Sequence, residues 1–516
     1  MLETNVPSKQ VININDYKDK VLGCWTGKNI GGTLGAPFEG KREMNDAVFY
    51  TQDLQGAPAP NDDLDLQLIW LLAAEEHGIY HITPRLLGEY WINYIVGPWN
   101  EYSVCKANIA NGLYPPLSGS CNNDAWKYSN GAWIRSEIWA CLFPGSPDDA
   151  AVFAYMDSCC DHCGEGIYAE VFTATAEAAA FIESDVRKLI EIGLSKIPKD
   201  CRIAHCVKLA CELYDKGTPF KDARERIVKD NEDLGWFQAP GNIGFTILGL
   251  LYGEGDFGKS ICLANNCGDD TDCTAATVGA LLGIISGRKG IPQNWIAPIG
   301  ETIKTVAIDP FELNIPKTLG ELTSRVVAQA LLTQHENPTL IRIANEKTSI
   351  DSAYLAKLAD SSEVAKRVWS KSPYALTFDL PFGDLVIDYQ DGPFATPGVP
   401  KSITLYIESQ MFVENTVQIA FKLPEGWSAP NGRAVAINCI RRAPARATIQ
   451  LIPGAFDGVF EHVPLEIRLA GRFNPVLVSV PFQRKGAVCQ FPAAGTPIDQ
   501  SAWDRRNVRY ARACVE

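Results

Sequence analysis

The chain has 516 residues, a formal net charge of −14 and a hydrophobic share of 46%. This length predicts two or three domains, and the composition is that of a globular protein with a sizeable core. General binding of nucleic acids or of anionic membranes needs a basic surface, so we expect neither partner, although a local pocket could hold a small anionic ligand.

The sequence shows no signal for export or for membrane insertion. The N-terminal segment lacks the apolar stretch of a secretory signal, and no run of about 18 apolar residues occurs. We therefore expect a cytoplasmic protein, unless a signal has been removed, with its 16 cysteines as reduced thiols. The cluster Cys159, Cys160, His162 and Cys163 is too compact for the usual paired ligands of structural zinc.

The first predicted helix begins near residue 15 and carries a stripe of glycines. Gly23, Gly27, Gly31 and Gly35 recur every four residues and therefore share one helix face. Each glycine costs about 1 kcal/mol relative to alanine in a helix. The stripe therefore predicts that another backbone packs very close to this face. The loop that follows contains a single acid, Glu39.

The second predicted helix opens on an acidic segment that follows a proline-rich loop. Asn61 is its natural N-terminal cap, and Asp62 and Asp63 lie in its first turn. Asp65 lies one helical turn after Asn61, where it either joins the same cluster or faces solvent.

A similar acidic segment opens a later helix of small apolar residues. Asp269, Asp270 and Asp272 precede this helix, together with Cys273. One carboxylate suits the positive end of a helix, but adjacent carboxylates repel one another. The residues alone leave two interpretations open. The segments either cap two helices independently, or face each other and bind one or two Mg²⁺ or Ca²⁺ ions.

The two halves of the chain differ in pattern. Periodicity is helical as far as about residue 315, so we predict an all-α domain over residues 1–330, followed by a helical connector over 331–370. Residues 371–516 predict an all-β, immunoglobulin-like sandwich, because short alternating segments are separated by turns. The predicted strands are Ala375–Leu380, Leu385–Tyr389, Ser402–Glu408, Thr416–Lys422, Ala434–Asn438, Ala447–Leu451 and Val476–Pro481. The sandwich shows no catalytic constellation, and we expect it to pack on the helical domain, to mediate oligomer contacts or to form one wall of a cleft.

Five sequence blocks occur in a characteristic order between residue 15 and about 330. They are the glycine stripe ending at Glu39, the segment Asn61-Asp62-Asp63-Leu64, the block Asn130-Gly131-Ala132-Trp133-Ile134-Arg135, the segment Asp161-His162-Cys163, and Gly268-Asp269-Asp270-Thr271-Asp272-Cys273. Together they resemble the ADP-ribosylglycohydrolase family, which includes the dinitrogenase reductase activating glycohydrolases. The chain resembles a divergent branch of that family with an added β-sandwich.

This resemblance implies a pair of divalent ions, usually Mg²⁺ with Ca²⁺ or Mn²⁺ as possibilities, between the two acidic helix starts. The implied metal ligands are Asn61, Asp62, Asp63, Asp270, Asp272 and Cys273. Glu39, with Asp62 and Asp63, is expected to serve catalysis. Asn130, Gly131 and His162 are expected to line the groove that binds the substrate.

Departures from the family pattern lie close to the implied ions. Asn61 stands where the family has threonine, and its amide oxygen can still bind a hard cation. Cys273 replaces another threonine, and a thiol is a poor Mg²⁺ ligand. Leu64 and Gly32 replace a threonine and an aspartate. One metal position is therefore expected to be weaker, absent or filled by a softer ion.

Three functions remain open from the sequence. The first is metal-dependent removal of ADP-ribose from a protein side chain or a small group. The second is hydrolysis of another glycosidic bond in a carbohydrate or nucleoside-like compound, favoured by Trp99, Trp126 and Trp133 in loops and by the lack of an obvious basic cluster beside the motifs. The third is a binding protein with a degenerate metal site.

Overall fold

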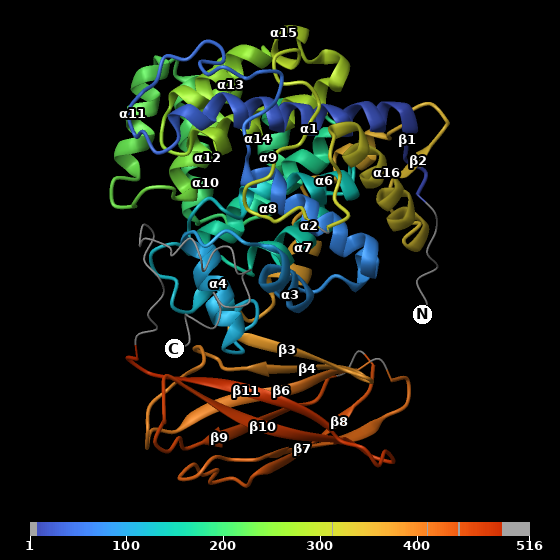
Figure 1. Ribbon diagram of the computed structural model, residues 1–516. Helices are drawn as coiled ribbons and strands as arrows, with labels where there is room; N and C mark the ends of the chain where they lie inside the picture. Colours follow the sequence, from blue (N-terminus) through green and yellow to red (C-terminus); the bar gives the residue numbers. More distant parts are fainter. Residues whose placement is uncertain (1–7, 312, 410, 442–443, 488–516) are drawn as a thin grey trace.

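The computed structural model describes residues 8–487 except 312, 410, 442 and 443, and it places a helical domain above a β-sandwich (Figure 1). The C-terminal part of the predicted sandwich domain lies outside the described residues. The helical domain contains α1 (Ile14–Gly35), α2 (Asp62–His77), α3 (Pro84–Tyr94), α4 (Asn100–Ala110), α5 (Leu117–Ser120), α6 (Glu137–Leu142), α7 (Pro147–Ser158), α8 (Glu165–Ala180), α9 (Val186–Ser195), α10 (Arg202–Asp215), α11 (Phe220–Asp230), α12 (Ala239–Gly253), α13 (Phe257–Asn266), α14 (Thr271–Ser286), α15 (Gln293–Ile296) and α16 (Leu319–Glu336).

Helices α1 and α14 lie against each other, backbone to backbone (Figure 1). A Cβ atom added to Gly27 would lie 1.9 Å from the carbonyl oxygen of Gly279, and one added to Gly279 would lie 2.3 Å from that of Gly27. At the C-terminal end of α1, a Cβ on Gly35 would lie 2.3 Å from the Cα of Asp272. The predicted close backbone contact is therefore confirmed, and it brings the end of α1 directly to the acidic start of α14.

Large aromatic side chains fill the core of the helical domain. Trp25, Trp70, Trp91, Trp133 and Trp139 are fully buried there. Because indole rings bury a large apolar area, this core is a major source of stability. Trp133 is among these buried residues, which corrects the expectation that it stacks on a sugar from a surface loop.

The predicted connector is only partly helical. Residues Arg342–Ala344 form strand β2, which pairs in parallel with β1 (Val11–Asn13) near the N-terminus. The short helices α17 (Ser352–Leu355) and α18 (Ser362–Val364) follow. Val364 and Val368 are buried in the core of the helical domain, so this segment packs as part of that domain.

Two sheets form the C-terminal sandwich. One sheet has the order β3-β4-β6-β9 and contains β3 (Ala375–Leu380), β4 (Gly383–Asp388), β6 (Lys401–Ser409) and β9 (Arg446–Leu451). The other has the order β5-β11-β10-β7-β8 and contains β5 (Phe394–Ala395), β11 (Val476–Arg484), β10 (Phe460–Leu469), β7 (Asn415–Phe421) and β8 (Ala434–Cys439). Their inward-facing residues, such as Leu405 and Leu465, share one apolar core. Only β10 and the two-residue β5 are absent from the predicted strands.

The sandwich packs against a segment of the helical domain next to α4 and α5. Leu113, Leu117 and Cys121 are buried in the apolar core of the sandwich. Beside them, the side-chain amides of Asn122 and Gln483 donate hydrogen bonds to each other, at 3.1 and 2.8 Å. The expectation that the sandwich packs on the helical domain is thus met by a mixed apolar and polar interface.

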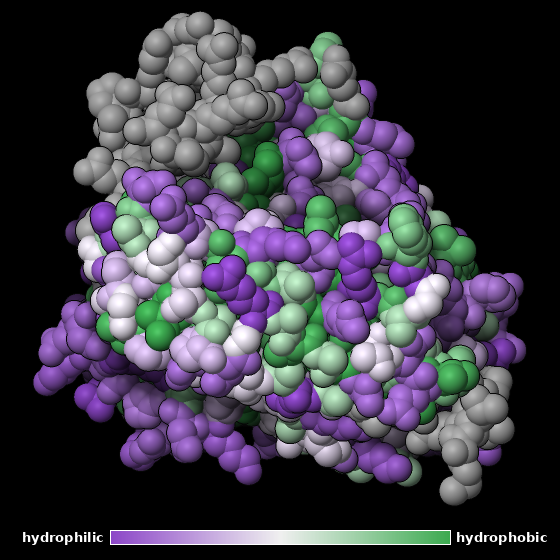
Figure 2. Space-filling model, turned by 90° about the horizontal axis from the view of Figure 1, so that it is seen from below, coloured by the Kyte–Doolittle hydropathy of each residue, from purple (hydrophilic) through white to green (hydrophobic). Residues whose placement is uncertain are grey.

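The face of the molecule on the sandwich side mixes apolar and polar side chains (Figure 2). Within the sandwich, Phe412, Val413, Phe473 and Leu477 are exposed apolar residues. An oligomer contact through the sandwich stays a prediction. Within the described residues, no helix is both long and apolar enough to cross a membrane.

Candidate metal centre and active site

The starts of α2 and α14 meet at the end of α1 and bring their acids together. The acids here form two groups of side chains, and within each group the possible ligand atoms lie within 4.8 Å of one another. The outer group consists of Glu39, Asp270 and Asp272, and the inner group consists of Asp63, Asp272 and Cys273. Asp272 belongs to both groups. The sequence-based prediction that the two acidic helix starts face each other therefore describes the geometry correctly.

The outer group is a concentration of negative charge with little to balance it. Burial, together with the carboxylate of Glu39, raises the pKa of Asp272 to about 7. Burial and the carboxylates of Asp62 and Asp63 raise the pKa of Glu39 to about 7, although its tip is exposed to solvent. Burial and the neighbouring Asp272 raise the pKa of Asp270 well above its usual range.

One oxygen of the outer group has no partner within the described residues. Asp272 Oδ1 is buried and forms no hydrogen bond. A buried, unpaired carboxylate oxygen is costly, and a divalent cation would satisfy it while relieving the repulsion among the acids. The outer group thus fits a hard divalent cation such as Mg²⁺.

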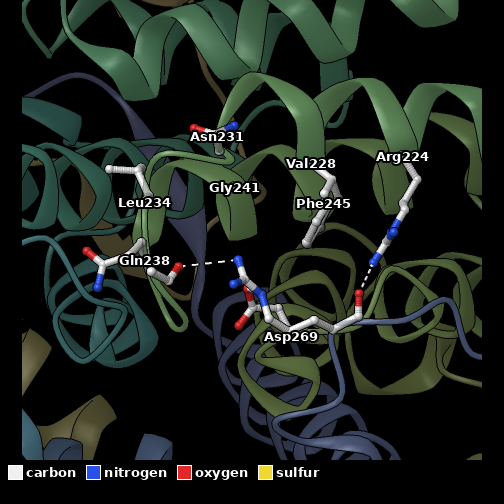
Figure 3. Close-up of a pocket in the computed structure, with 10 residues that line it drawn as sticks. Arg224, Val228, Asn231, Leu234, Gln238, Gly241, Phe245 and Asp269 are labelled. Carbon is white, nitrogen blue, oxygen red and sulfur yellow. Dashed lines mark hydrogen bonds and ion pairs between the residues drawn. The ribbon is translucent and has the colours of Figure 1, made fainter.

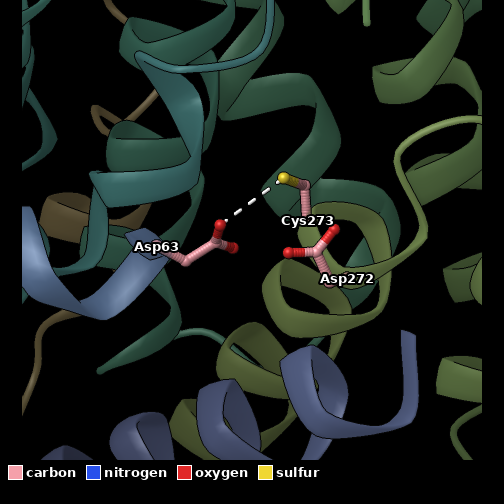
Figure 4. A group of neighbouring side chains, drawn as sticks. All are labelled: Asp63, Asp272 and Cys273. Carbon is pink, nitrogen blue, oxygen red and sulfur yellow. Dashed lines mark hydrogen bonds between the residues drawn. The ribbon is translucent and has the colours of Figure 1, made fainter. Parts of the chain in front are cut away.

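The inner group fits such an ion poorly. The Cys273 thiol donates a weak hydrogen bond to Asp63 Oδ1 across 3.5 Å (Figure 4). Asp63 Oδ2 lies 3.2 Å from the ammonium nitrogen of Lys28. Burial and the surrounding acids raise the pKa of the Cys273 thiol, which keeps it protonated. Both oxygens of Asp63 are therefore engaged, and the third group is a neutral thiol that does not suit Mg²⁺.

Asn61 and Asp62 border the outer group. The Asn61 amide oxygen accepts a hydrogen bond from the Asp63 backbone N–H at 2.7 Å, and its nitrogen lies 3.3 Å from Asp272 Oδ2, to which it donates. The Asp62 carboxylate accepts a hydrogen bond from the Tyr102 hydroxyl at 3.0 Å. A Cβ on Gly32 would lie 2.2 Å from the Asn61 amide nitrogen, so this glycine leaves room for Asn61. The ligand role of Asn61 stays a prediction, and its observed contacts are those of a cap and a donor.

Asn130 contacts the acidic cluster directly. Its amide nitrogen donates a hydrogen bond to Asp270 Oδ2 at 2.7 Å, while its oxygen accepts one from the Trp133 indole at 3.0 Å. Next to it, a Cβ on Gly131 would lie 2.2 Å from Glu101 Oε1. This loop therefore holds Asp270 in place, and a side chain at position 131 would displace the Glu101 carboxylate.

His162 contacts the same loop through Ser129. Its ring is fully buried, with Nε2 3.0 Å from the Ser129 hydroxyl and Nδ1 2.9 Å from Asp161. Arg135 holds Asp161 with two donated hydrogen bonds, at 3.0 and 2.7 Å. The predicted contact of His162 with substrate stays a prediction, and its observed role is to position the 129–131 segment.

The cysteines beside His162 have local partners of their own. The Cys159 thiol lies 3.5 Å from the backbone carbonyl of Met156, and the Cys160 thiol lies at the same distance from that carbonyl. His162 faces away from them, toward Ser129. These contacts fit helix-bound thiols in a packed interior.

Asp65 takes neither of the two places predicted for it. It is fully buried, and one of its oxygens accepts hydrogen bonds from the backbone N–H groups of Val306 and Ala307, both at 2.6 Å. Burial raises its pKa to about 8 despite these donors. Asp65 therefore fixes the 306–307 loop to α2 and lies outside both acidic groups.

Several residues that contact the acidic cluster were not predicted from the sequence. Lys28 and Glu137 form a buried ion pair beside Asp63, at 2.9 Å between Nζ and Oε1. Tyr102 holds Asp62, and the Asn242 side chain accepts the backbone N–H of Asp270 at 3.3 Å. Their sequence neighbourhoods give no signal, because only the packing of distant helices brings them to the cluster.

A small pocket lies next to the acidic cluster and contains two arginines. Arg42, Arg224 and Asp269 line it, together with residues of α11 and α12 (Figure 3). Arg42 Nε lies 3.4 Å from Asp269 Oδ2, and its guanidinium lies 5.4 Å from the centre of the Trp236 ring. The side chain of Arg42 is 38% exposed. Basic side chains are therefore present beside the motifs, where the sequence showed no obvious basic cluster.

Comparison with known proteins identifies the family of this chain. The sequence profile described as ADP-ribosylglycohydrolase matches residues 13–336, which include both acidic groups. Among solved structures, the chain is similar to one titled "ADP-ribosylglycohydrolase-related protein complex", with 20% identity and a TM-score of 0.40, over 62% of this chain and 99% of that one. No curated protein matches the sequence. Because the profile spans more than half of the chain, this protein is a member of the ADP-ribosylglycohydrolase family.

Proposed function

We propose that the chain is a metal-dependent hydrolase that releases ADP-ribose from a protein side chain or a small group. The observation that carries the proposal is the outer group, in which Glu39, Asp270 and Asp272 converge and Asp272 Oδ1 has no partner among the described residues. Hydrolysis of a glycosidic bond needs such acids to activate water beside an oxocarbenium-like centre. The family membership supports hydrolase chemistry in general.

Asp270, Asp272 and Asp62 would hold a divalent cation, for which we propose Mg²⁺. The cation would supply Lewis acidity, which orients ribose hydroxyls and lowers the pKa of water. Asn130 and Tyr102 fix the carboxylates of Asp270 and Asp62 through hydrogen bonds. Such supporting donors set the direction of a carboxylate and so its affinity for a cation.

We propose that Glu39 accepts a proton from the attacking water. It lies on a loop after α1, is the most exposed acid of the outer group and has a pKa raised to about 7 by burial and by the neighbouring acids. A base with a pKa close to the working pH transfers protons efficiently. We assign Glu39 the role of general base, with Asp62 and Asp63 completing the predicted catalytic set.

Arg42 favours an ADP-ribosyl substrate over a neutral sugar. Its partly exposed guanidinium lies three residues from Glu39 in the chain and stacks near Trp236, which is 44% exposed. A guanidinium binds phosphate oxygens, and an indole can stack on a base or sugar. We propose that this edge of the site receives the pyrophosphate side of the substrate.

A second candidate is hydrolysis of an uncharged glycoside by the same acids. The exposed faces of Trp236 and Trp99, which is 38% exposed, support it because aromatic rings also stack on sugars. In this case Arg42 would form its ion pair with Asp269 and would not contact the substrate.

A substrate panel distinguishes the two candidates. Purified protein with Mg²⁺ is incubated with an ADP-ribosylated protein, small ADP-ribosyl compounds and oligosaccharides, with Asp270→Asn as the inactive control. We expect release of ADP-ribose from one of the first two classes, and Arg42→Ala to raise KM there more than it lowers kcat. Release of sugar from oligosaccharides alone would favour the second candidate. Ligand binding without turnover would point to a binding protein with a degenerate site.

We also propose a cytoplasmic setting. The 14 cysteines within the described residues are free thiols, which suits a reducing compartment.

A further inference from the structure

A buried lysine lies beside the inner acidic group. Lys28 is on α1, its side chain is only 1% exposed, and its ammonium nitrogen lies 3.2 Å from Asp63 Oδ2 and 2.9 Å from Glu137 Oε1. The same ammonium donates a hydrogen bond to the backbone carbonyl of Ile134. Three acceptors thus surround the ammonium, and one of them is a residue expected to bind a metal ion.

The partners of Lys28 are themselves fixed. The Gln67 side chain donates hydrogen bonds to Glu137 Oε2 at 2.8 Å and to the backbone carbonyl of Asp63 at 2.9 Å. Its oxygen accepts the backbone N–H of Ile138 at 2.8 Å. Gln67 thus ties α2 to α6 and holds Asp63 and Glu137, the two acidic partners of the Lys28 ammonium, in place.

An ion in the inner group would therefore meet a fixed positive charge. It would share Asp63 with the ammonium, in a buried place where water screens the repulsion between the two charges weakly. The remaining groups are the Cys273 thiol and Asp272, which also serves the outer group. Among the described residues, no cationic side chain forms an ion pair with the carboxylates of the outer group, and Asp270 and Asp272 receive hydrogen bonds from the neutral amides of Asn130 and Asn61.

We propose that the Lys28 ammonium takes the place of a second divalent ion, so that the chain binds one hard cation in the outer group and none in the inner group. The inference rests on the proposed function, because it assumes that the outer group binds a cation. It makes Lys28, rather than Cys273, the residue that decides the number of ions. Cys273 then serves as a neutral hydrogen-bond donor to Asp63.

Metal counting tests this proposal without reference to turnover. The protein is equilibrated with excess Mn²⁺, dialysed, and its bound manganese is counted per chain by elemental analysis. Electron paramagnetic resonance then distinguishes an isolated Mn²⁺ from a coupled pair. We expect one isolated ion in the wild type, and still one in Cys273→Thr, because the ammonium remains. We expect two coupled ions when Cys273→Thr is combined with Lys28→Met and Glu137→Gln.

The paired change at Lys28 and Glu137 removes one positive and one negative charge, so that neither is left buried alone. Circular dichroism and thermal melting check that each variant is folded. Two ions in the wild type or in Cys273→Thr would overturn the proposal, as would a single ion in the folded triple variant. A wild type that binds no ion would instead overturn the proposed function, and this inference with it.

Discussion

The amide nitrogen of Asn130 donates a hydrogen bond to Asp270 Oδ2 across 2.7 Å, and this contact joins two sequence blocks that lie far apart in the chain. Both side chains are buried, at 2% and 5% exposure. The bond leaves Asp270 with a fixed orientation toward the outer group. The Asn-Gly-Ala block therefore contacts the acidic cluster directly, in addition to any contact with substrate.

Asn130→Ala is expected to weaken Mn²⁺ binding by roughly 10–100-fold, because outer-shell donors typically have effects of this size on metal affinity. Titration calorimetry on the folded variant measures the change. Asn93→Ala provides the control, since Asn93 is an exposed residue of α3 that donates only to the Glu89 carbonyl. Unchanged affinity in Asn130→Ala would show that the hydrogen bond does not orient Asp270.

Asp65→Asn should leave metal binding unchanged, whereas Asp270→Asn should abolish it. Asp65 is buried and bonded to the N–H groups of Val306 and Ala307, and its raised pKa of about 8 keeps it largely neutral at pH 7. An amide can accept the same two hydrogen bonds with its oxygen. A large loss of Mn²⁺ affinity in the Asp65 variant would place this residue among the ligands after all.

The metal-free protein should lose stability as the pH rises from about 4 to about 7. The pKa values of Asp272 and Glu39 are both raised to about 7 in the folded chain, from ordinary values near 4 in the unfolded chain. The folded state therefore binds more protons over this range, and its free energy of unfolding falls as they are lost.

Thermal melting at several pH values, with and without Mg²⁺, measures this dependence. Mg²⁺ should raise the melting temperature more at about pH 8 than at about pH 5, since protons and the cation compete for the same carboxylates. Equal shifts at both pH values would contradict the assignment of Asp272 as a ligand.

Gly27→Ala is expected to destabilise the fold by about 3 kcal/mol or more, because its Cβ would lie 1.9 Å from a backbone carbonyl oxygen of α14. Gly320→Ala is the matched control. Gly320 lies in α16 with no heavy atom within 4 Å of an added Cβ, so alanine there should be neutral or stabilise by up to about 1 kcal/mol. Chemical denaturation measures both. Similar small effects for the two variants would contradict the close approach of α1 and α14.

The sequence predicted the meeting of the two acidic helix starts because its signals are local. Acids in the first turn of a helix and glycines at a spacing of four are visible in any short window. The glycine stripe also predicted a partner backbone, although it did not identify α14. The two acidic segments are brought together at Gly35. A Cβ added there would lie 2.3 Å from the Cα of Asp272, so the Glu39 loop that follows lies beside the acidic start of α14.

Other parts of the structure depend on contacts that no short window contains. Lys28 lies on the glycine-rich helix and would be expected to face solvent, yet α2 and α6 enclose it beside Asp63 and Glu137. In the sandwich, β10 is absent from the predicted strands, and it contains Pro464, a residue that is unusual inside a strand. In fact Pro464 lies opposite Ser479 in the ladder with β11, and its carbonyl accepts a hydrogen bond from Lys422.

We propose that hydrolysis by this chain requires a cation bound at the outer group. The most direct test is the release of ADP-ribose from an ADP-ribosylated substrate before chelation, after exhaustive chelation and dialysis, and after Mg²⁺ is restored, with Asp270→Asn alongside. We predict that activity disappears on chelation, returns with Mg²⁺ in the wild type and does not return in Asp270→Asn. Turnover that survives chelation in protein free of measurable metal would contradict it.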